Sequence, residues 1–585
     1  MRVPVLLLIL LFAGKSLAQE PVRYGPDWES LSSRPFPKWF REAKLGIFIH
    51  WGVYSVPAWS GPEQYAEWFL RGLQVGDQPR LDFMHRVYGP DFQYRDFADK
   101  FRAELFDPED WAALFRASGA RYVVLTAKHH DGFCLWPSEQ APNWNAYDVG
   151  PKRDLVGDLS TAVREAGLRM GLYYSLPEWN HPLYRWGQPN SNNDVNQYVR
   201  EHMIPQFQSL MSRYRPAVVF SDGDWDHPAT TWRSAELLAW LYNDSGCPKD
   251  VVVNERWGAG CTVGFPTPEY SAGIQPGARP WVECRGLGRS FGWNRNEKLE
   301  AYMTRKELVH FLCRAVSHGG GLLLNVGPAG DGRIPLLQQD RLVGLGEWLA
   351  INGEAIYATE AWPPYGTWRD VEVERIDPTL DFDWVRNSPA KGISPDHFEA
   401  EWNGFFQAPA DGLFGFRMEA DDHAELYLDG EAWKAGQSRR MSKGERVPVR
   451  LLFREKTHQA SVRLYLAQAF QKEVPVPASC WFQDAAGKHP GLKARYRSKQ
   501  QHLAFTQTDD AVYAICLEWP DRGFSVPWPQ PTPDFEVGLV GSEHRFPFLW
   551  EDGRLWIETA DFPWNQLPGP HAWCFKLPKP PDQGR

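Results

Sequence analysis

Residues 19–358 alternate short apolar runs with longer segments whose apolar residues recur at helical spacing. Unbroken apolar runs are typical of strands buried on both faces, and a spacing of three to four residues is typical of amphipathic helices. The pattern predicts strands over 46–51, 122–126, 171–175, 217–220, 250–254, 280–284 and 321–326, and helices over 38–44, 159–166, 197–214, 231–242, 305–317 and 336–350. This alternation predicts a parallel sheet with helices on its faces.

The order of these elements indicates an α/β fold, a (β/α)8-like, TIM-type barrel, regular or irregular. Its strand ends are polar and aromatic, as they are around barrel sites. A doubly wound open sheet is the alternative. No glycine-rich phosphate loop follows any of the strands, which favours the barrel.

Beyond about residue 355 the apolar positions alternate with period two, as in antiparallel strands with one buried face. Strands are predicted over 402–405, 413–418, 424–428, 447–453, 461–466 and 512–517. Asp429-Gly430 predicts a tight hairpin turn. We therefore expect a catalytic barrel over 19–358 followed by two β-sandwich domains, over 370–490 and 491–585.

Residues 1–18 have the pattern of a cleavable export signal. Arg2 precedes the apolar run 5–12, and Ser16-Leu17-Ala18 is a small-residue cleavage site. The run is shorter than the roughly 20 apolar residues that span a bilayer, and no later segment is long and apolar enough. We expect an exported protein without a membrane span, in a secreted, periplasmic or lysosome-type location.

Composition narrows the class of ligand. The chain has 29 Trp and a net charge of −10. Flat aromatic rings match the apolar face of a sugar, and an acidic chain without a basic stripe is a poor nucleic-acid binder. The eight cysteines form no C-x-x-C pair, which argues against a zinc knuckle. The sequence leaves disulfide pairing and oligomeric state open.

An acidic cluster follows the predicted strand 217–220. Asp222 comes after Ser221, and Gly223 and Asp224 come next. A carboxylate at the C-terminal tip of a buried parallel strand lies where α/β enzymes carry their catalytic groups. The alternative interpretation is an acidic turn that caps the strand.

Other polar and aromatic side chains stand at strand ends or in the loops between units. These histidine, tryptophan, tyrosine, carboxylate and arginine side chains suit a neutral, polyhydroxylated ligand. Each residue taken alone could also be an ordinary core or surface residue. Adjacent histidines on a strand point to opposite faces, which disfavours joint metal binding. The set comprises His50, Trp51, Glu67, Trp68, His129, His130, Tyr174, Arg256, Trp257 and Glu269.

Cleavage of a glycosidic bond needs two carboxyl groups with different roles. One attacks the sugar or activates water, and the other holds a proton for the leaving oxygen. Asp222 and Asp224 are the candidates for the ionised group. Glu269, Glu255 and Glu283 are the candidates for the acid.

Eight motifs, taken together and in order, resemble the retaining α-L-fucosidases of glycoside hydrolase family twenty-nine. Each motif alone is weakly specific, but eight motifs in the order of the family are highly specific. The motifs are G-I-F-I-H-W-G-V-Y-S-V-P at 46–57, Y-A-E-W at 65–68, K-H-H-D-G-F at 128–133, F-S-D-G-D-W at 220–225, V-N-E-R-W-G at 253–258, R-G-L-G-R-S-F-G-W-N at 285–294, L-L-N-V-G-P-A-G-D-G at 323–332 and N-G-E-A-I-Y at 352–357.

The resemblance implies roles for individual residues. Asp222 would be the nucleophile that forms a fucosyl-enzyme ester, and Glu269, in T-P-E-Y, would be the acid/base. Phe48 and Phe291 would line the pocket for the C6 methyl group. The fucose hydroxyls would be held by His50, Glu67, Trp68, His129, His130 and Arg256. The motif adds Tyr174 to this set, with Tyr173 as the alternative.

The segment 395–430 resembles the β-sandwich module named after anthrax protective antigen. Some relatives of that module bind sugars through calcium held by adjacent aspartates, and Asp421-Asp422 stands in the matching place. The alternative is a turn that leads into a strand. No other cofactor is expected.

The expected activity is removal of terminal α-L-fucose from fucosylated glycans by double displacement. Two alternatives stay open at this stage. The first is a retaining exo-glycosidase of another specificity, such as α-D-galactosides. The second is a catalytically inactive glycan-binding protein.

Overall fold

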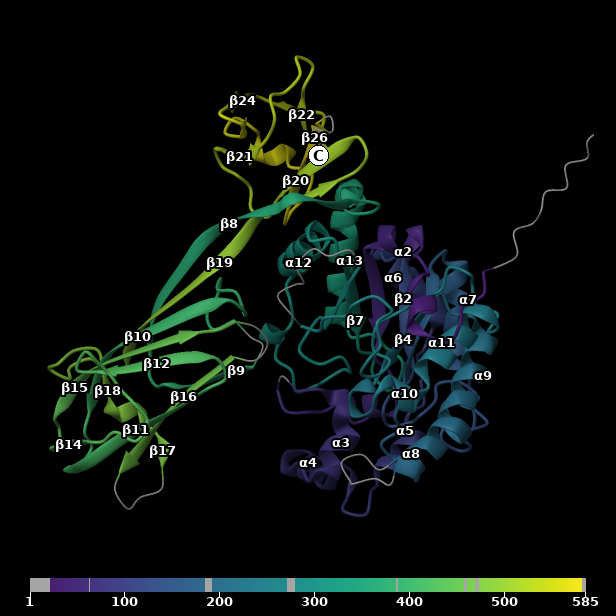
Figure 1. Cartoon of the computed structure of the whole chain (residues 1–585), viewed down its shortest axis with the longest axis horizontal. Helices are drawn as coiled ribbons and strands as arrows, with labels where there is room; N and C mark the ends of the chain where they lie inside the picture. Colours follow the sequence, from purple (N-terminus) through teal and green to yellow (C-terminus); the bar gives the residue numbers. More distant parts are fainter. Residues whose placement is uncertain are drawn as a thin grey trace, which may run out of the picture.

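The computed structural model describes residues 22–62, 64–184, 192–270, 279–385, 388–456, 460–468 and 473–580. The predicted export signal lies outside the described residues. Figure 1 shows three parts: a barrel domain with helices around a sheet, an elongated middle β domain in green, and a small C-terminal β domain in yellow.

The barrel domain is built on a seven-stranded sheet in which every neighbouring pair of strands is parallel. All seven predicted strands are present, which confirms the alternating pattern. In spatial order they are β5 (Val252–Val253), β4 (Val218–Asp222), β3 (Arg169–Ser175), β2 (Tyr122–Lys128), β1 (Leu45–Ile49), β7 (Gly321–Val326) and β6 (Val282–Gly286).

A short irregular segment, residues 265–270, joins the two edge strands of this sheet. On one side the Phe265 amide donates to the Val253 carbonyl oxygen at 3.0 Å. On the other side the Cys284 amide donates to the Pro268 carbonyl oxygen at 2.8 Å, and the Tyr270 amide donates to the Cys284 carbonyl oxygen at 3.3 Å. The backbone therefore completes an irregular barrel without an eighth helix-linked strand, as expected for a TIM-like fold.

Helices cover the outside of the barrel sheet (Figure 1). The predicted helix 197–214 is interrupted: α8 and α9 flank a π-helical turn at Val199–Met203, and Pro205, which has no amide hydrogen, lies at the start of α9. The principal helices are α2 (Lys38–Ala43), α6 (Pro108–Ala117), α7 (Leu155–Glu165), α8 (Asn192–Tyr198), α9 (Ile204–Tyr214), α10 (Ala229–Trp232), α11 (Ser234–Asn243), α12 (Arg305–Ser317) and α13 (Leu336–Asn352).

Two long antiparallel strands connect the β domains. β8 (Glu360–Asp377) pairs along its length with β19 (Leu492–Gln507). β19 also pairs with β10 (Phe398–Gln407) of the middle domain and with β20 (Ala511–Cys516) of the C-terminal domain. A single sheet thus runs through both domains, although their apolar cores are separate.

The predicted strands of the middle domain are present with longer bounds. Its two sheets pack apolar faces against each other, as expected for a sandwich. Asp429 and Gly430 both have positive φ, at 56° and 84°, which is the conformation of the predicted hairpin turn. The remaining main strands are β9 (Asp381–Val385), β11 (Gly412–Ala420), β12 (His423–Leu428), β15 (Arg446–Arg454) and β16 (Ala460–Gln468).

The structure shows the state of the cysteines and whether any described helix could cross a membrane. All eight cysteines are free thiols, most of them buried. None of the described helices has the length and apolar character needed to cross a membrane.

Candidate active site

The acidic cluster after β4 opens into a pocket of about 370 Å³ at the C-terminal end of the barrel strands. Pockets of this size hold small organic ligands. Most of the predicted site residues line it, although they come from distant parts of the chain. The lining residues are Phe48, His50, Tyr65, Glu67, Trp68, His129, His130, Tyr173, Phe220, Asp222, Trp225, Arg256, Glu269, Cys284 and Phe291.

Asp222 is the last residue of β4, and its side chain is largely buried. The Tyr173 hydroxyl donates to Oδ2 at 2.9 Å, and Arg256 Nη1 donates to Oδ1 at 3.0 Å. His130 Nε2 lies 3.7 Å from Oδ2. Both oxygens of the carboxylate are therefore held in fixed directions with one edge toward the pocket.

Glu269 belongs to the segment that closes the barrel, and it faces the same pocket. Arg256 Nη2 donates to Glu269 Oε2 at 3.2 Å, and the Tyr65 hydroxyl donates to Oε1 at 2.5 Å. One planar guanidinium thus binds Asp222 through one terminal nitrogen and Glu269 through the other. The two carboxylates, 47 positions apart in the chain numbering, meet across a single cation.

Three histidines contribute ring nitrogens to the pocket. The Asn325 amide nitrogen donates to the Phe291 carbonyl oxygen, so its oxygen accepts from His50 Nδ1 at 2.7 Å. The Ser175 hydroxyl donates to the Pro177 carbonyl oxygen, so Nδ1 of His130 donates to it at 2.6 Å. In the neutral rings Nε2 then carries no hydrogen and can accept a hydrogen bond.

Burial keeps these imidazoles neutral. It lowers the pKa of His50 to about 4, although the Asn325 hydrogen bond opposes this shift. Burial, together with the neighbouring histidines, lowers the pKa of His129 well below its usual value. Burial, together with the charges of His50 and Lys128, does the same for His130. Uncharged nitrogens of this kind suit hydroxyl groups better than anions.

His129 and His130 both point into the pocket, and their ring centroids are 4.3 Å apart. The expectation that the two rings lie on opposite faces is wrong here. β2 ends at Lys128, and its register with β3 shifts between Thr126 and Lys128. The strand alternation therefore no longer applies to the two residues that follow.

The tyrosine pair on β3 obeys the alternation, which corrects one predicted site residue. Tyr174 does not line the pocket: its hydroxyl donates to Gln206 Oε1 at 2.8 Å, and Lys128 Nζ lies 4.0 Å from its ring centre. Tyr173, the alternative, lines the pocket and binds Asp222. Only the residue whose side chain faces the barrel interior can reach the carboxylate.

Glu67 and Trp68 lie at one side of the pocket. Glu67 Oε2 accepts from the Gly292 amide at 2.8 Å and from the Ser290 hydroxyl at 3.1 Å. Burial raises the pKa of Glu67 to about 7 despite these hydrogen bonds. Trp68 stacks on Trp225 with ring centroids 6.2 Å apart, and Trp225 is half exposed at the pocket mouth.

Phe48 and Phe291 form an apolar wall, with ring centroids 6.4 Å apart and His50 between them in contact with both rings. Both phenylalanines are almost fully buried. A small apolar substituent of a ligand has a matching surface here.

The competing acidic candidates lie elsewhere. Asp224 Oδ2 accepts from the Gly258 amide at 3.0 Å. Glu255 Oε1 accepts from the Thr267 amide at 2.7 Å. Glu283, fully buried, borders a different cavity. None of the three lines the pocket that holds Asp222.

Sequence reasoning did not assign a role to four lining residues: Tyr65, Phe220, Trp225 and Cys284. Tyr65 had a usable signal, because it is two positions before Glu67 in a turn that leads back to the pocket. Cys284 had none, since it reaches the pocket only because the barrel closes through residues 265–270.

The two aspartates predicted to hold calcium, Asp421 and Asp422, accept hydrogen bonds from backbone amides. Asp421 Oδ1 accepts from the backbone amides of Asp422 at 3.1 Å and Ser461 at 2.8 Å, and Asp422 Oδ2 accepts from the Lys456 amide at 2.8 Å. Within the described residues no group of three or more His, Cys, Asp or Glu side chains is arranged to hold a metal ion. Calcium binding by Asp421 and Asp422 therefore stays a prediction, with the strand-entry turn as its alternative.

Comparison with protein-family models gives a match to each part of the chain. Residues 11–354 match the alpha-L-fucosidase model, 359–479 the PA14 domain and 497–578 the alpha-L-fucosidase C-terminal domain. The middle match is the module that residues 395–430 resemble. The first match alone covers more than half of the chain.

Individual relatives agree with these matches. The tissue alpha-L-fucosidase of Homo sapiens is 47% identical over 371 residues, which are 61% of this chain and 78% of that protein. The plasma alpha-L-fucosidase of Rattus norvegicus is 45% identical over 363 residues, 60% of this chain and 77% of that protein. The solved structure of Thermotoga maritima alpha-fucosidase in complex with fucose has a TM-score of 0.63 and 29% identity, covering 95% of this chain and all of that one. The chain therefore belongs to the α-L-fucosidase family of glycoside hydrolases.

Proposed function

We propose that this enzyme removes terminal α-L-fucose from glycans with retention of configuration, using Asp222 as nucleophile and Glu269 as acid/base. The observation that carries the proposal is the Arg256 guanidinium, which binds both carboxylates in one sugar-sized pocket. Two carboxyl groups that face one bond are the requirement for glycoside hydrolysis.

In the first step Asp222 attacks the anomeric carbon while Glu269 donates a proton to the leaving oxygen. The hydrogen bonds from Tyr173 and Arg256 orient the attacking carboxylate. Tyr65 and Arg256 hold Glu269 on the side of the leaving group. In the second step Glu269 takes a proton from water, and the water releases fucose from the ester.

The pocket walls support fucose as the sugar. The Nε2 acceptors of His50 and His130 suit hydroxyl protons. Phe48 and Phe291 suit the C6 methyl group, and a hydroxymethyl group in its place would bury a hydroxyl against apolar rings. Such a difference is worth roughly 1–3 kcal/mol in specificity.

The relatives include tissue and plasma enzymes, and the first 18 residues have the pattern of an export signal. We therefore propose an exported enzyme that meets its glycans in a secretory, extracellular or lysosome-type compartment. The proposed partners are fucosylated oligosaccharides and glycoconjugates.

The test is hydrolysis of an aryl α-L-fucoside followed by proton NMR from the first seconds. The proposal predicts that α-L-fucose appears first and then mutarotates. An aryl α-D-galactoside, run in parallel, should react at least about tenfold more slowly in kcat/KM. First appearance of the β anomer, or preference for the galactoside, would contradict the proposal.

A further inference from the structure

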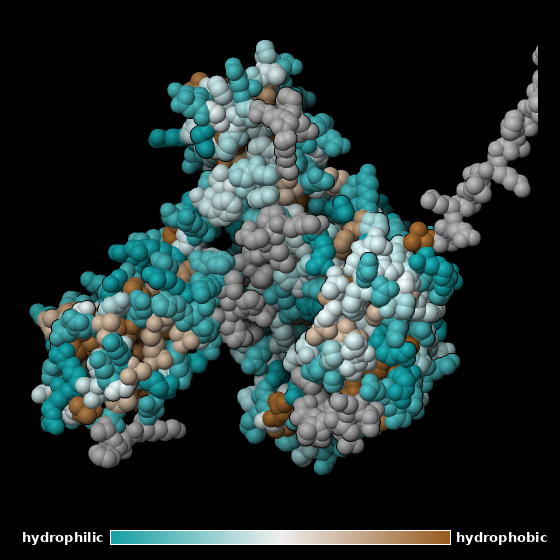
Figure 2. Space-filling view, viewed as in Figure 1, coloured by the Kyte–Doolittle hydropathy of each residue, from teal (hydrophilic) through white to brown (hydrophobic). Residues whose placement is uncertain are grey.

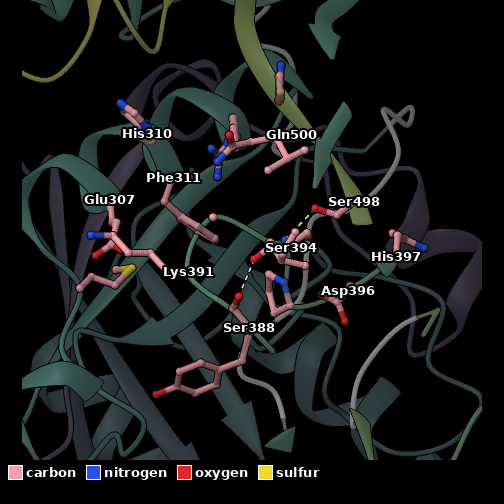
Figure 3. Close-up of a pocket in the computed structure, with 18 of the residues that line it drawn as sticks. Glu307, His310, Phe311, Ser388, Lys391, Ser394, Asp396, His397, Ser498 and Gln500 are labelled. Carbon is pink, nitrogen blue, oxygen red and sulfur yellow. Dashed lines mark hydrogen bonds between the residues drawn. The ribbon is translucent and has the colours of Figure 1, made fainter. Parts of the chain in front are cut away.

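A second and larger cavity, of about 1550 Å³, lies between the barrel domain and the middle β domain. One wall comes from β6 and α12 of the barrel. The other comes from β8, β19 and residues 388–399. Figure 3 shows side chains of α12, such as Phe311, and of the facing segments, such as Ser394 and Ser498, around the same space. We call this cavity the interdomain cleft. Figure 2 shows mainly hydrophilic surface on the two domains that flank it.

Strand β6 separates the interdomain cleft from the proposed active site. Cys284 lines the active-site pocket, whereas its neighbours Glu283 and Arg285 line the cleft. This division follows from the alternation of side chains along a strand. Near Pro62 and Tyr270 the cleft reaches the barrel end where the pocket opens, since Tyr270 follows Glu269 in the chain.

Three arginines of the cleft have no close ion-pair partner among the described residues. Within the described ranges no ion pair and no guanidinium hydrogen bond is formed by Arg285, Arg289 or Arg314. The Nε atom of each is buried without a hydrogen-bond partner. Buried polar groups are almost always satisfied, so three such exceptions along one cavity mark guanidinium groups that the described residues do not fully pair.

The three guanidinium groups follow one wall. Arg285 Cζ lies 4.5 Å from the ring centre of Phe311 and 5.4 Å from that of Tyr270. Arg314 is one helical turn beyond Phe311 on the same face of α12. Burial is the main cause that lowers the pKa of Arg285. The charges of Glu283 and Glu307 oppose this shift, and the charge of Arg289 adds to it. Burial also lowers the pKa of Arg314.

Four of the eight acidic residues that line the cleft are engaged by other groups. Glu307 accepts from the backbone and side chain of Thr304 in the α12 capping box. Glu297 accepts from two backbone amides, at Arg289 and Ser290. A second set pairs with arginines of the β domains, Glu372 with Arg497 and Glu399 with Arg454. The charges of Glu283 and Glu307 act on Arg285, and the charges of Glu297 and Arg289 act on each other, although no close ion pair is formed by these arginines in the described part of the chain.

Partly buried cations without a close ion pair are costly, and an arginine stays charged at any pH a protein meets. Its planar fork matches sulfate and carboxylate oxygens. We propose that the interdomain cleft binds an anionic saccharide, one that carries a sulfate ester or a carboxylate, through Arg285, Arg289 and Arg314.

The position of the cleft identifies this saccharide as the part of the substrate that leaves. This step rests on the proposed function, in which Glu269 protonates the leaving oxygen. A chain that departs past Glu269 and Tyr65 meets Tyr270 and Pro62 at the open end of the cleft. Trp368, 46% exposed, adds an aromatic surface further along it.

The direct test is titration calorimetry with saccharides that contain no fucose, so that binding does not depend on the active-site pocket. The probes are a sulfated N-acetyllactosamine tetrasaccharide, a sialylated one and the uncharged parent. The wild-type enzyme should bind at least one charged probe about tenfold or more tightly than the parent. The probe that binds identifies the anion as sulfate or carboxylate.

The double variant Arg285→Gln/Arg314→Gln should reduce binding of the charged probe to the level of the parent. Arg41→Gln, at an exposed arginine of α2 without an ion pair, is the matched control and should bind like the wild type. Hydrolysis of an aryl fucoside checks folding, because neither arginine touches that substrate. The variant Arg285→Lys/Arg314→Lys keeps the charge and should retain part of the affinity if the glutamine pair fails to fold.

Equal binding of charged and uncharged probes, or equal loss for both in the double variant, would overturn the inference. The two proposals fail separately. Loss of fucoside hydrolysis with intact anion binding contradicts only the assigned reaction, and hydrolysis without anion selectivity contradicts only the cleft.

Discussion

The pocket on the inner face of β6 and the cleft on its outer face differ in how their charged side chains are paired. In the pocket Arg256 binds two carboxylates, and the histidines are neutral. In the cleft the Nε atoms of Arg285 and Arg314 are buried without a hydrogen-bond partner in the described structure. Only strand β6 separates these two environments. Its alternate side chains face different cavities.

The difference indicates what each cavity binds. A site whose charges are paired and fixed in advance presents oriented dipoles to a neutral sugar, and it needs no reorganisation during the reaction. A cavity with unpaired cations gains most from a ligand that supplies the missing charge. Chemistry on a neutral fucose and recognition of a charged glycan are thereby assigned to different faces of one strand.

The largest expected effect comes from the paired side of this comparison. Asp222→Gly removes the proposed nucleophile and should lower kcat on an aryl α-L-fucoside by about 10⁴-fold or more. Azide should restore part of the turnover and give fucosyl azide. Undiminished hydrolysis would show that the carboxylate is structural.

Glu269→Ala should cost about 10²–10⁴-fold for a substrate with a poor leaving group, because such a group needs the proton most. A dinitrophenyl fucoside, whose leaving group needs little help, should lose far less. Comparing the two substrates measures the role directly. Equal losses would mean that Glu269 is not the proton donor.

Two tyrosine variants test whether catalysis depends only on the side chain of β3 that faces the barrel interior. Tyr173→Phe removes the hydrogen bond to Asp222 and should lower kcat about 10–100-fold, the value of a hydrogen bond to a charged group. Tyr174→Phe removes a hydroxyl that binds Gln206 outside the pocket and should change kcat less than about twofold while lowering the melting temperature. The reverse pattern would contradict the placement of the two rings.

The smallest expected effect is on the pH dependence of the melting temperature, through Glu67. Burial raises the folded-state pKa of Glu67 to about 7, above its ordinary value near 4.5. The folded protein then holds this proton more tightly than the unfolded chain, so Glu67 costs increasing stability as pH rises from about 4.5 to 7. Glu67→Gln should remove that cost and shift the melting temperature of the barrel domain upward by a few degrees at pH 7 relative to pH 4.5. A shift independent of pH would contradict the assignment.

Much of the barrel is readable from the sequence, because strands buried on both faces are unbroken apolar runs and their polar ends share one edge. Asp222, His50 and Arg256 were found in this way. Residues 265–270 were not recognised as barrel backbone, since they make single bridges and carry no strand pattern.

The remaining differences have local causes. The register shift at the end of β2 places both His129 and His130 in the pocket, and periodicity alone cannot show such a shift. The interdomain cleft has no sequence signal, because its arginines lie on β6, on α12 and in a loop that meet only in the folded chain. The continuous strand β19 joins two sandwiches that the sequence pattern separates near residue 490.

The most direct measurement of the central claim is covalent trapping with 2-deoxy-2-fluoro-L-fucosyl fluoride. Its fluoride leaves readily, and its ring fluorine slows hydrolysis of the ester that forms. Peptide mass spectrometry should find one fluorofucosyl group, attached to Asp222, with time-dependent loss of activity that free fucose slows. A label on any other side chain, or turnover of the reagent with no label at all, would contradict the account.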